Sequence, residues 1–232
     1  MKGTFINAFM ILLGSGIGLL LGKRLHVRFQ QSIMQVLGIT VGLIGLQMAF
    51  KSQEPIILII SLALGTLLGE WWDLDGRISR LSEQISGRFT KDKDNKFTQG
   101  FITTSMLYCA GAMAILGAFQ EGLEGSPTIL YTKAVLDGIS SIFFAASLGV
   151  GVAFSAVSVL LYQGSLTLLA NTFAPYFTPT AIAELTGTGG AILCAISLTI
   201  LNIQTIRVAN LLPAIPIAIL IALWVPLQTT HF

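Results

Sequence analysis

Charged residues are scarce in this chain of 232 residues, in which Asp, Glu, Lys and Arg together make up 10%. Hydrophobic residues make up 53%, and the mean hydropathy is +0.80. A water-soluble fold of this length needs far more surface charge, so the composition excludes an ordinary soluble protein. The charge is also uneven, because 11 of the 24 charged residues fall between Asp73 and Lys96. The sequence therefore predicts an all-α, polytopic transmembrane helical bundle that forms one integral membrane domain over residues 1–232.

The chain also lacks the marks of a metal site, a cofactor site or a catalytic centre. It has two cysteines, Cys109 and Cys194, each inside an apolar run, and two histidines, His26 and His231. None has a companion at metal-ligand spacing, and the sequence contains neither a phosphate-binding loop nor a nucleophile elbow. We therefore expect no metal, no cofactor and no enzymatic activity. The net charge of +2 is too small to indicate a nucleic-acid partner, which leaves the lipid bilayer as the expected surroundings.

Long apolar runs predict where the chain crosses the membrane. A bilayer core about 30 Å thick needs about 20 apolar residues per helix. We expect eight spans, at 4–22, 33–50, 55–72, 99–119, 129–149, 151–171, 182–201 and 208–227. Only the weak turn "LGVGV" at 148–152 separates the fifth span from the sixth, so a count of seven stays open.

The Lys and Arg residues predict the orientation, because cytoplasmic loops carry most of them. With eight spans, ten fall on one side: Lys23, Arg24, Arg28, Arg77, Arg80, Arg88, Lys91, Lys93, Lys96 and Arg207. Only Lys2, Lys51 and Lys133 fall on the other side. This bias places residues 73–98 in the cytoplasm and both termini outside it.

The 73–98 segment has a helical pattern of its own. Ile78, Leu81, Ile85 and Phe89 recur at helical spacing among polar residues. This spacing predicts a short amphipathic helix on the cytoplasmic surface, between the third and fourth spans. The "TKDKDNK" that follows predicts a solvated linker.

Two parts of the chain resemble each other weakly. "LGITVGLIGLQMAF" and then "PIILIISLALGTLLGEWW", in spans two and three, are similar to "LTGTGGAILCAISLTIL" and then "LLPAIPIAILIALW", in spans seven and eight. Spans 1–3 and 6–8 are an odd number of positions apart, so equivalent helices would run in opposite directions. Such inverted repeats are common in transporters, with a binding site near the midplane where the repeats meet. A general likeness among glycine-rich membrane helices explains the pattern as well, so both interpretations stay open.

Lys133 and Asp137 are the only charged residues between Ile129 and Gly164. A lysine or an aspartate at the centre of a spanning helix costs roughly 2.5–3.5 kcal/mol, so such residues point to function. At i, i+4 the two share a helix face and can pair. Asp137 is too short to reach water alone, so it must pair or face a wet cavity. Lys133 lies nearer the outer boundary, where its long stem could instead reach the interface as a topology anchor.

Glu184 precedes a glycine run formed by Gly187, Gly189 and Gly190 in the seventh span. Glycines let a ligand or another backbone approach closely, and a broken or closely packed helix start there would present amide groups to an anion or a polar solute. A close contact between helices, with Glu184 as a carboxylate near a helix N-terminus, explains the pattern equally well.

Uncharged polar residues also occur within the spans. Asn7, near the start of the first span, and Gln163, in the sixth, are candidates for a polar pathway. Hydrogen bonds between helices are the commoner role of such residues. Gln120 and Glu121 are expected in an exposed loop.

Long stretches of the sequence resemble one bacterial family. They are "GTFINAFMILLGSGIGLLLG" at the start, "GFITTSMLYCAGAMAILGAFQEGLEGS" and "YTKAVLDGISSIFFAASLGVGVAFSAVSVLLYQGSLTLLA" in the centre, and "GTGGAILCAISLTILNIQTIRVANLLPA" near the end. They are similar to the YqgA/YdfK-like family of integral membrane proteins, whose domain has no assigned function. That family tends to carry "CVGPMAILGS" where this chain has "CAGAMAILGA", so Ala112 stands in place of the usual proline. The resemblance implies a multi-pass protein of the bacterial cytoplasmic (inner) membrane, of a kind usually described as a possible transporter.

These features predict a transporter or channel for a small solute or ion. The predicted pathway is lined by Asp137, Lys133, Glu184, Asn7, Gly187, Gly189, Gly190 and Gln163. The alternative is a non-transporting membrane scaffold or sensor that acts through the cytoplasmic 73–98 segment. Because small-residue helix faces are plentiful, self-association into a homo-oligomer is a further prediction.

Overall fold

The structure is a computed structural model that describes residues 1–22, 27–78, 80, 96–109 and 111–224. Its elements are all helical, which confirms the predicted all-α class. They are α1 Lys2–Gly22, α2 Val27–Ala49, α3 Pro55–Trp72, α5 Lys96–Cys109, α6 Ala112–Phe119, the π-helical turn η1 Gln120–Glu124, α7 Thr128–Leu148, α8 Gly151–Leu168, the short α9 Ala170–Phe173 and η2 Ala174–Tyr176, α10 Pro179–Ile200, η3 Val208–Leu211 and α11 Ala214–Trp224.

The helices confirm a polytopic bundle. Within the described part of the chain, six helices are long and apolar enough to cross a membrane, and the bent pair formed by α5 and α6 gives up to seven. Val208–Trp224 is a shorter apolar segment, which coincides with the last predicted span. Most predicted bounds agree with the helices to within a few residues.

Gly149 separates two helices that the sequence left poorly resolved. α7 ends at Leu148, and α8 begins at Gly151. Gly149 has φ 81° and ψ −157°, a backbone conformation that residues with a Cβ rarely adopt. The weak glycine turn is therefore a true break, and the fifth and sixth predicted spans are separate helices.

The fourth predicted span, 99–119, is broken rather than continuous. α5 and α6 meet at a bend of 56°. The N-cap of α6 is Gly111, in an extended conformation, and Ala114 N–H donates to its carbonyl oxygen. Ala112 is the first residue of α6, so the break forms at a glycine and without a proline. Broken helices are tolerated in membranes where they are buried in protein or line a cavity.

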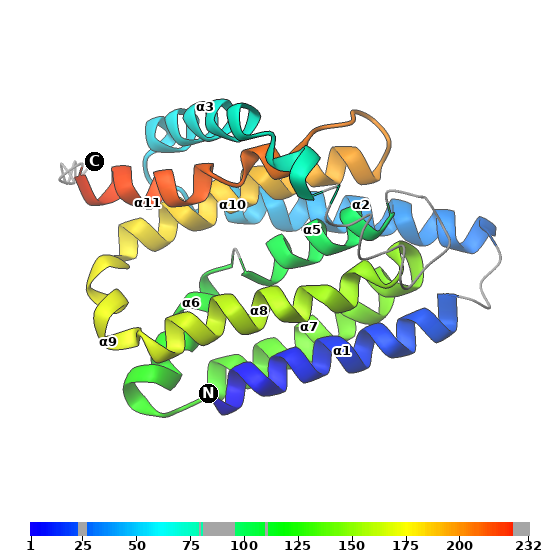
Figure 1. Ribbon diagram of the computed structural model, residues 1–232, viewed down its shortest axis with the longest axis horizontal. Coiled ribbons are helices and arrows are strands. Elements are labelled where there is room, and N and C mark those ends of the chain that lie inside the picture. Colours follow the sequence, from blue (N-terminus) through cyan, green and yellow to red (C-terminus); the bar gives the residue numbers. More distant parts are fainter. Residues whose placement is uncertain (23–26, 79, 81–95, 110, 225–232) are drawn as a thin grey trace.

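The helices run back and forth along the long axis of the molecule (Figure 1). α1 begins and α11 ends at one end of the bundle, here called the terminal end. The loop 201–207 and the end of α3 lie at the opposite end, here called the loop end. α1 and α8 run in opposite directions, as do α2 and α10, and α3 and α11. The inverted repeat requires these directions, but it stays a prediction. Of the predicted amphipathic helix, residues 74–78 are helical, and residues 81–95 lie outside the described part.

Glycines bring α1 against α7 and α2 against α10. A Cβ at Gly14 would overlap the carbonyl oxygen of Gly138, and one at Gly18 would overlap that of Ile142. Gly45 and Gly190 approach each other's backbone in the same way. Small residues give such contacts in membranes, where apolar burial alone does not favour one helix neighbour over another. These glycine faces are thus used within the chain, and a homo-oligomer stays a prediction.

The contacts divide the helices into two bodies. In the first helix body α1, α5, α6, α7 and α8 pack together, and in the second helix body α2, α3, η3, α10 and α11 do so. The bodies meet mainly where α2 crosses α7 and where α10 passes α5 and α6, and these contacts are less extensive than those of α1 with α7 and of α2 with α10. We call this contact the seam.

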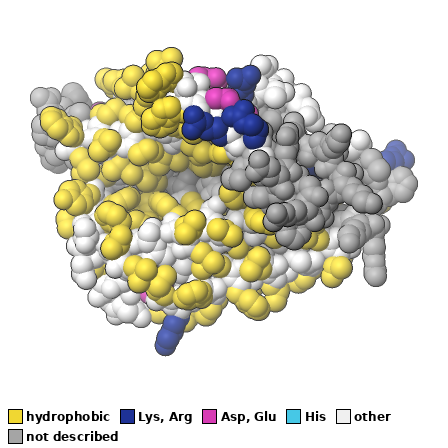
Figure 2. Space-filling view, viewed as in Figure 1, with side chains coloured by type: hydrophobic (Ala, Val, Ile, Leu, Met, Phe, Trp, Pro, Cys, Tyr) yellow, Lys and Arg dark blue, Asp and Glu magenta, His cyan; other side chains and the backbone are white. Residues whose placement is uncertain are grey.

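Hydrophobic side chains cover much of the face shown in Figure 2, and charged side chains gather at one edge of it. Phe5, Phe9, Leu20 and Leu161 are among the large apolar residues that are more than half exposed. A monomer in water rarely exposes apolar surface on this scale, whereas a lipid-facing helix requires it. The exposed ion pairs Arg80–Asp73 and Arg207–Glu70 lie near the loop end, each with an N–O distance of 3.4 Å.

Candidate functional site

Four polar side chains from three helices meet inside the first helix body. Lys133 and Asp137 of α7 form a buried ion pair. Asn7 Nδ2 of α1 donates to Asp137 Oδ2 at 3.0 Å and to Gln163 Oε1 of α8 at 3.2 Å. The structure thus brings together half of the predicted pathway residues, and we call these four the Asp137 cluster.

The position of the Asp137 cluster follows from helix geometry. Asp137 is near the middle of α7, about 14 Å along the axis from its first residue, which is close to half the thickness of a bilayer core. Lys133 lies one turn away on the same face. Because glycines let α1 approach α7 closely, the short side chain of Asn7 can reach the carboxylate.

The environment of Lys133 differs from the topology anchor that the sequence left open. Its side chain is 6% exposed and points to Asp137 instead of reaching the membrane interface. Its ammonium also lies 5.6 Å from the centre of the Tyr108 ring, a favourable cation–π distance. The expected pairing of Asp137 is therefore confirmed, and the anchor interpretation of Lys133 is wrong.

Tyr108 extends the network to the helix break. Its hydroxyl lies 2.8 Å from Ser141 Oγ, and it accepts a hydrogen bond from Ser140 Oγ at 3.1 Å. Ser141 Oγ also donates to the Asp137 backbone carbonyl, and Ser140 Oγ lies 3.0 Å from the same oxygen. Tyr108 is the penultimate residue of α5, so the Asp137 cluster lies beside the bend between α5 and α6. Sequence reasoning overlooked this tyrosine and these serines, whose signal was their polar character inside apolar spans.

The Asp137 cluster retains hydrogen-bonding capacity that the described residues do not use. Asn7 Oδ1 and Gln163 Nε2 are buried and have no partner among them. Both side chains belong to residues with no exposed surface. Buried polar atoms are nearly always paired, by protein, water or ligand, so one spare acceptor and one spare donor are notable here.

Glu184 belongs to a separate buried network in the second helix body. Its Oε1 accepts from the backbone N–H of Gln53 at 2.7 Å and of Glu54 at 2.9 Å, and Ser52 Oγ donates to Oε2 at 2.6 Å. These donors lie in the loop between α2 and α3, so this carboxylate completes the hydrogen bonds at the start of α3. The expectation that Glu184 serves a helix N-terminus is therefore met on α3, not on its own helix.

The glycine run after Glu184 is a packing surface. α10 is unbroken from Pro179 to Ile200, so the predicted broken helix start is wrong. A Cβ at Gly187 would meet Ser52, and one at Gly190 would meet the backbone of Ala49. Gly189 is buried in the same stretch. The contacts of these residues support the close-packing interpretation, and their role in a pathway stays a prediction.

Glu121 repeats the arrangement of Glu184 on another helix. It is buried, and its Oε1 accepts from Gly3 N–H of α1 at 2.9 Å and lies 3.0 Å from the Met1 amino group. The prediction of an exposed loop was wrong for this residue, because η1 folds back onto the start of α1. A carboxylate at a helix N-terminus is stabilised by free N–H groups and the helix dipole.

No group of three or more His, Cys, Asp or Glu side chains that could hold a metal ion occurs in the described part of the chain. Cys109 and Cys194 are free thiols. The contacts within the Asp137 cluster are two hydrogen bonds of Asn7 and the ion pair of Lys133 with Asp137.

Comparison with known proteins finds relatives along nearly the whole chain. Residues 2–223 match the family described as "Protein of unknown function (DUF554)". The "Uncharacterized membrane protein YdfK" of Bacillus subtilis (strain 168) is 34% identical over 219 residues, which cover 93% of each chain. The "Uncharacterized protein YqgA" of Escherichia coli (strain K12) is 33% identical over 227 residues, which cover 96% of this chain and 97% of the relative. No solved structure matches the chain significantly.

Proposed function

Because the chain belongs to the DUF554 family of membrane proteins, we propose that it is a multi-pass transporter for a small solute or ion. In this proposal the Asp137 cluster is the polar point of the pathway at mid-membrane. The protein is placed in the bacterial cytoplasmic membrane, with its termini outside and its loop end in the cytoplasm, as the distribution of Lys and Arg favours.

The observation that carries the proposal is the buried cluster itself. A charged pair costs free energy inside a membrane, and apolar residues of similar volume would be at least as stable there. The four side chains come from three helices and leave a donor and an acceptor unused. The adjacent break between α5 and α6 is a further feature typical of transporter sites.

The contacts of Glu184 give it no place in this pathway. Its carboxylate oxygens are occupied by the loop between α2 and α3, and it lies in the other helix body. The proposal therefore retains Asp137, Lys133, Asn7 and Gln163, and it leaves the glycine run out.

Reconstitution into lipid vesicles tests the proposal. Entry of small neutral solutes is followed by light scattering, and entry of salts is followed by membrane current. The matched control is the double variant Lys133→Gln/Asp137→Asn, which removes both charges and leaves neither ion unpaired. We expect the wild type to move at least one solute and the double variant, folded and monodisperse in detergent, to move none.

Equal flux through the wild type and the double variant would contradict the proposal. A folded wild type that moves nothing in either assay would favour the alternative of a scaffold or sensor.

A further inference from the structure

The seam between the two helix bodies is not uniform along its length. At the terminal end it is closed by one apolar cluster in which Ile115 and Phe119 of α6 pack with Leu185 of α10. The rings of Phe119 and Phe177 meet edge to face, with their centres 5.4 Å apart. Apolar side chains also pack across the seam at mid-depth, where Met106 and Phe144 join a cluster with Ile192.

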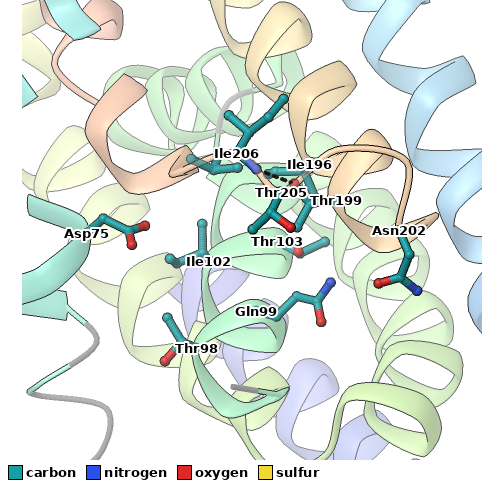
Figure 3. Close-up of a pocket in the computed structure, with 11 residues that line it drawn as sticks. Asp75, Thr98, Gln99, Ile102, Thr103, Ile196, Thr199, Asn202, Thr205 and Ile206 are labelled. Atoms are coloured by element: carbon teal, nitrogen blue, oxygen red, sulfur yellow. Dashed lines mark hydrogen bonds between the residues drawn. The ribbon is translucent and has the colours of Figure 1, made fainter. Parts of the chain in front are cut away.

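At the loop end the seam is hollow. A cavity of about 260 Å³ lies between α5, with Gln99 and Thr103, and α10, with Thr199 (Figure 3). Figure 3 shows Thr199 accepting a hydrogen bond from Ile206 N–H, at a distance of 3.3 Å, on one wall of this cavity. A second cavity, of about 520 Å³, lies between α2 and α7 and shares Gln99 and Asn202 with the first. We call the two cavities together the seam chamber.

Among the described residues that line the seam chamber, eight are apolar and nine carry uncharged hydrogen-bonding groups. The uncharged groups are the hydroxyls of Thr98, Thr103, Thr199, Thr205 and Ser147 and the amides of Gln31, Gln35, Gln99 and Asn202. Within the part of the chain that the structure describes, two charged residues line the chamber, and they have opposite signs and lie in different cavities: Asp75 in the first and Lys96 in the second. Such a lining suits a solute without net charge, because the described residues offer an ion no concentrated charge of the opposite sign.

The Asp137 cluster comes close to the seam at Ser140. Ser140 lines an apolar groove of about 520 Å³ where α2 crosses α7. The same hydroxyl donates to Tyr108 and lies 3.0 Å from the backbone carbonyl oxygen of Asp137. One side chain therefore lies between the Asp137 network and the edge of the seam where α2 crosses α7.

We propose that the seam is the solute path, that the seam chamber binds a small solute of no net charge, and that the two helix bodies separate at the terminal end to release it. This inference rests on the proposed function. The structure shows the state in which the terminal end is closed and the loop end is hollow. A seam that is closed at one end and hollow at the other is the arrangement expected of one state in alternating access.

Site-directed labelling tests the path without any knowledge of the solute. In a Cys109→Ala/Cys194→Ala background, Thr199→Cys reports on the seam chamber, Leu185→Cys reports on the closed end, and Lys51→Cys serves as an exposed control. A membrane-impermeant methanethiosulfonate reagent is added to one side of sealed vesicles at a time. We expect Thr199→Cys to react from the loop side, and Leu185→Cys to react slowly and only from the terminal side.

A cross-link across the closed end gives the decisive outcome. Adding Phe119→Cys and Phe177→Cys, bridged by a bifunctional thiol reagent before labelling, should abolish the reaction of Leu185→Cys and leave that of Thr199→Cys intact. The inference is overturned if Leu185→Cys reacts equally with and without the bridge, or if Thr199→Cys is inert from both sides. Because labelling needs no flux, this failure is distinct from a failure of transport.

The entry of probe solutes into the reconstituted vesicles tests the predicted solute class. The probes are glycerol and glycine, which carry no net charge at neutral pH, and sodium sulfate. We expect net-neutral probes to enter, and Gln99→Leu to slow them several-fold with the fold retained. Entry of sulfate alone, or of neutral probes at the same rate through Gln99→Leu, would overturn the assignment of the chamber.

Discussion

Two buried carboxylates in the same bundle are held in opposite ways. Glu184 has no exposed surface, and its carboxylate accepts hydrogen bonds from two backbone N–H groups and one hydroxyl of a single loop. Asp137 is 7% exposed and is held by the ammonium of Lys133 and the amide of Asn7, which come from two helices. The first carboxylate has partners at both oxygens, and the second belongs to a cluster with an unused donor and an unused acceptor.

The difference separates a structural carboxylate from a functional candidate. Backbone donors cannot move without unfolding the loop, so the Glu184 network has one arrangement. Side chains on three helices can exchange partners when those helices shift, and spare polar atoms can pair with a passing molecule. Both residues are buried, so burial does not distinguish them. The distinction lies in their hydrogen-bond partners, which come from one loop for Glu184 and from side chains on helices for Asp137.

The largest expected effect comes from breaking the ion pair on one side only. Asp137→Ala leaves the Lys133 ammonium buried without a counter-ion, which costs about 3–5 kcal/mol in known cases. The double variant Lys133→Gln/Asp137→Asn should recover most of that loss, because no charge remains. Thermal unfolding in detergent measures both. A single variant as stable as the double one would show that Lys133 has access to water.

Removal of the Glu184 carboxylate should lower the free energy of unfolding by less than Asp137→Ala does. Glu184→Ala leaves the amides of Gln53 and Glu54 without their acceptor, and a buried unpaired group costs about 1–3 kcal/mol. Gln53 is exposed, so water can compensate in part. Glu184→Gln keeps an oxygen for the two amides and should melt within a few degrees of the wild type. If Gln is as damaging as Ala, the charge itself is required, and the comparison with Asp137 fails.

The contact that holds Asn7 against Asp137 can be probed with a matched pair of glycines. A Cβ at Gly14 would overlap the carbonyl oxygen of Gly138, whereas one at Gly16 meets nothing within 4 Å. Gly14→Ala should lower the free energy of unfolding by about 1–3 kcal/mol. Gly16→Ala should be neutral or slightly stabilising, because alanine favours helix. Equal stabilities for the two variants would contradict the close approach of α1 to α7.

An exposed ion pair should have the smallest effect. Arg207 and Glu70 are 66% and 47% exposed, with an N–O distance of 3.4 Å. Arg207→Ala should change the stability by less than about 1 kcal/mol, because water screens such pairs. A larger loss, measured by the same unfolding assay, would mean that ion pairing at the loop end matters as much as it does at mid-membrane.

Composition and hydrophobic runs predicted the helical bundle and most of the helix bounds. They did so because the bilayer requires every spanning segment to be helical and apolar, whatever its neighbours are. The cost of a buried charge identified Asp137 in the same way, and the i, i+4 spacing predicted its partner. Each of these inferences depends on the residues of a single helix.

What the sequence could not predict depends on contacts between distant segments. Asn7 and Gln163 are 156 positions apart, and nothing local shows that they meet. Glu121 looked exposed because its role depends on Gly3 of another helix. The break between α5 and α6 lacks the proline that usually marks a sharp kink, so the local sequence did not predict it.

Transport by two variants, measured side by side, tests the central claim most directly. Lys133→Gln/Asp137→Asn and Glu184→Gln are reconstituted at equal amounts, and their solute fluxes are compared with that of the wild type. The account predicts loss of flux in the first variant and flux close to that of the wild type in the second. Retained flux in the first variant, with loss in the second, would contradict the account, because the pathway would then run through Glu184.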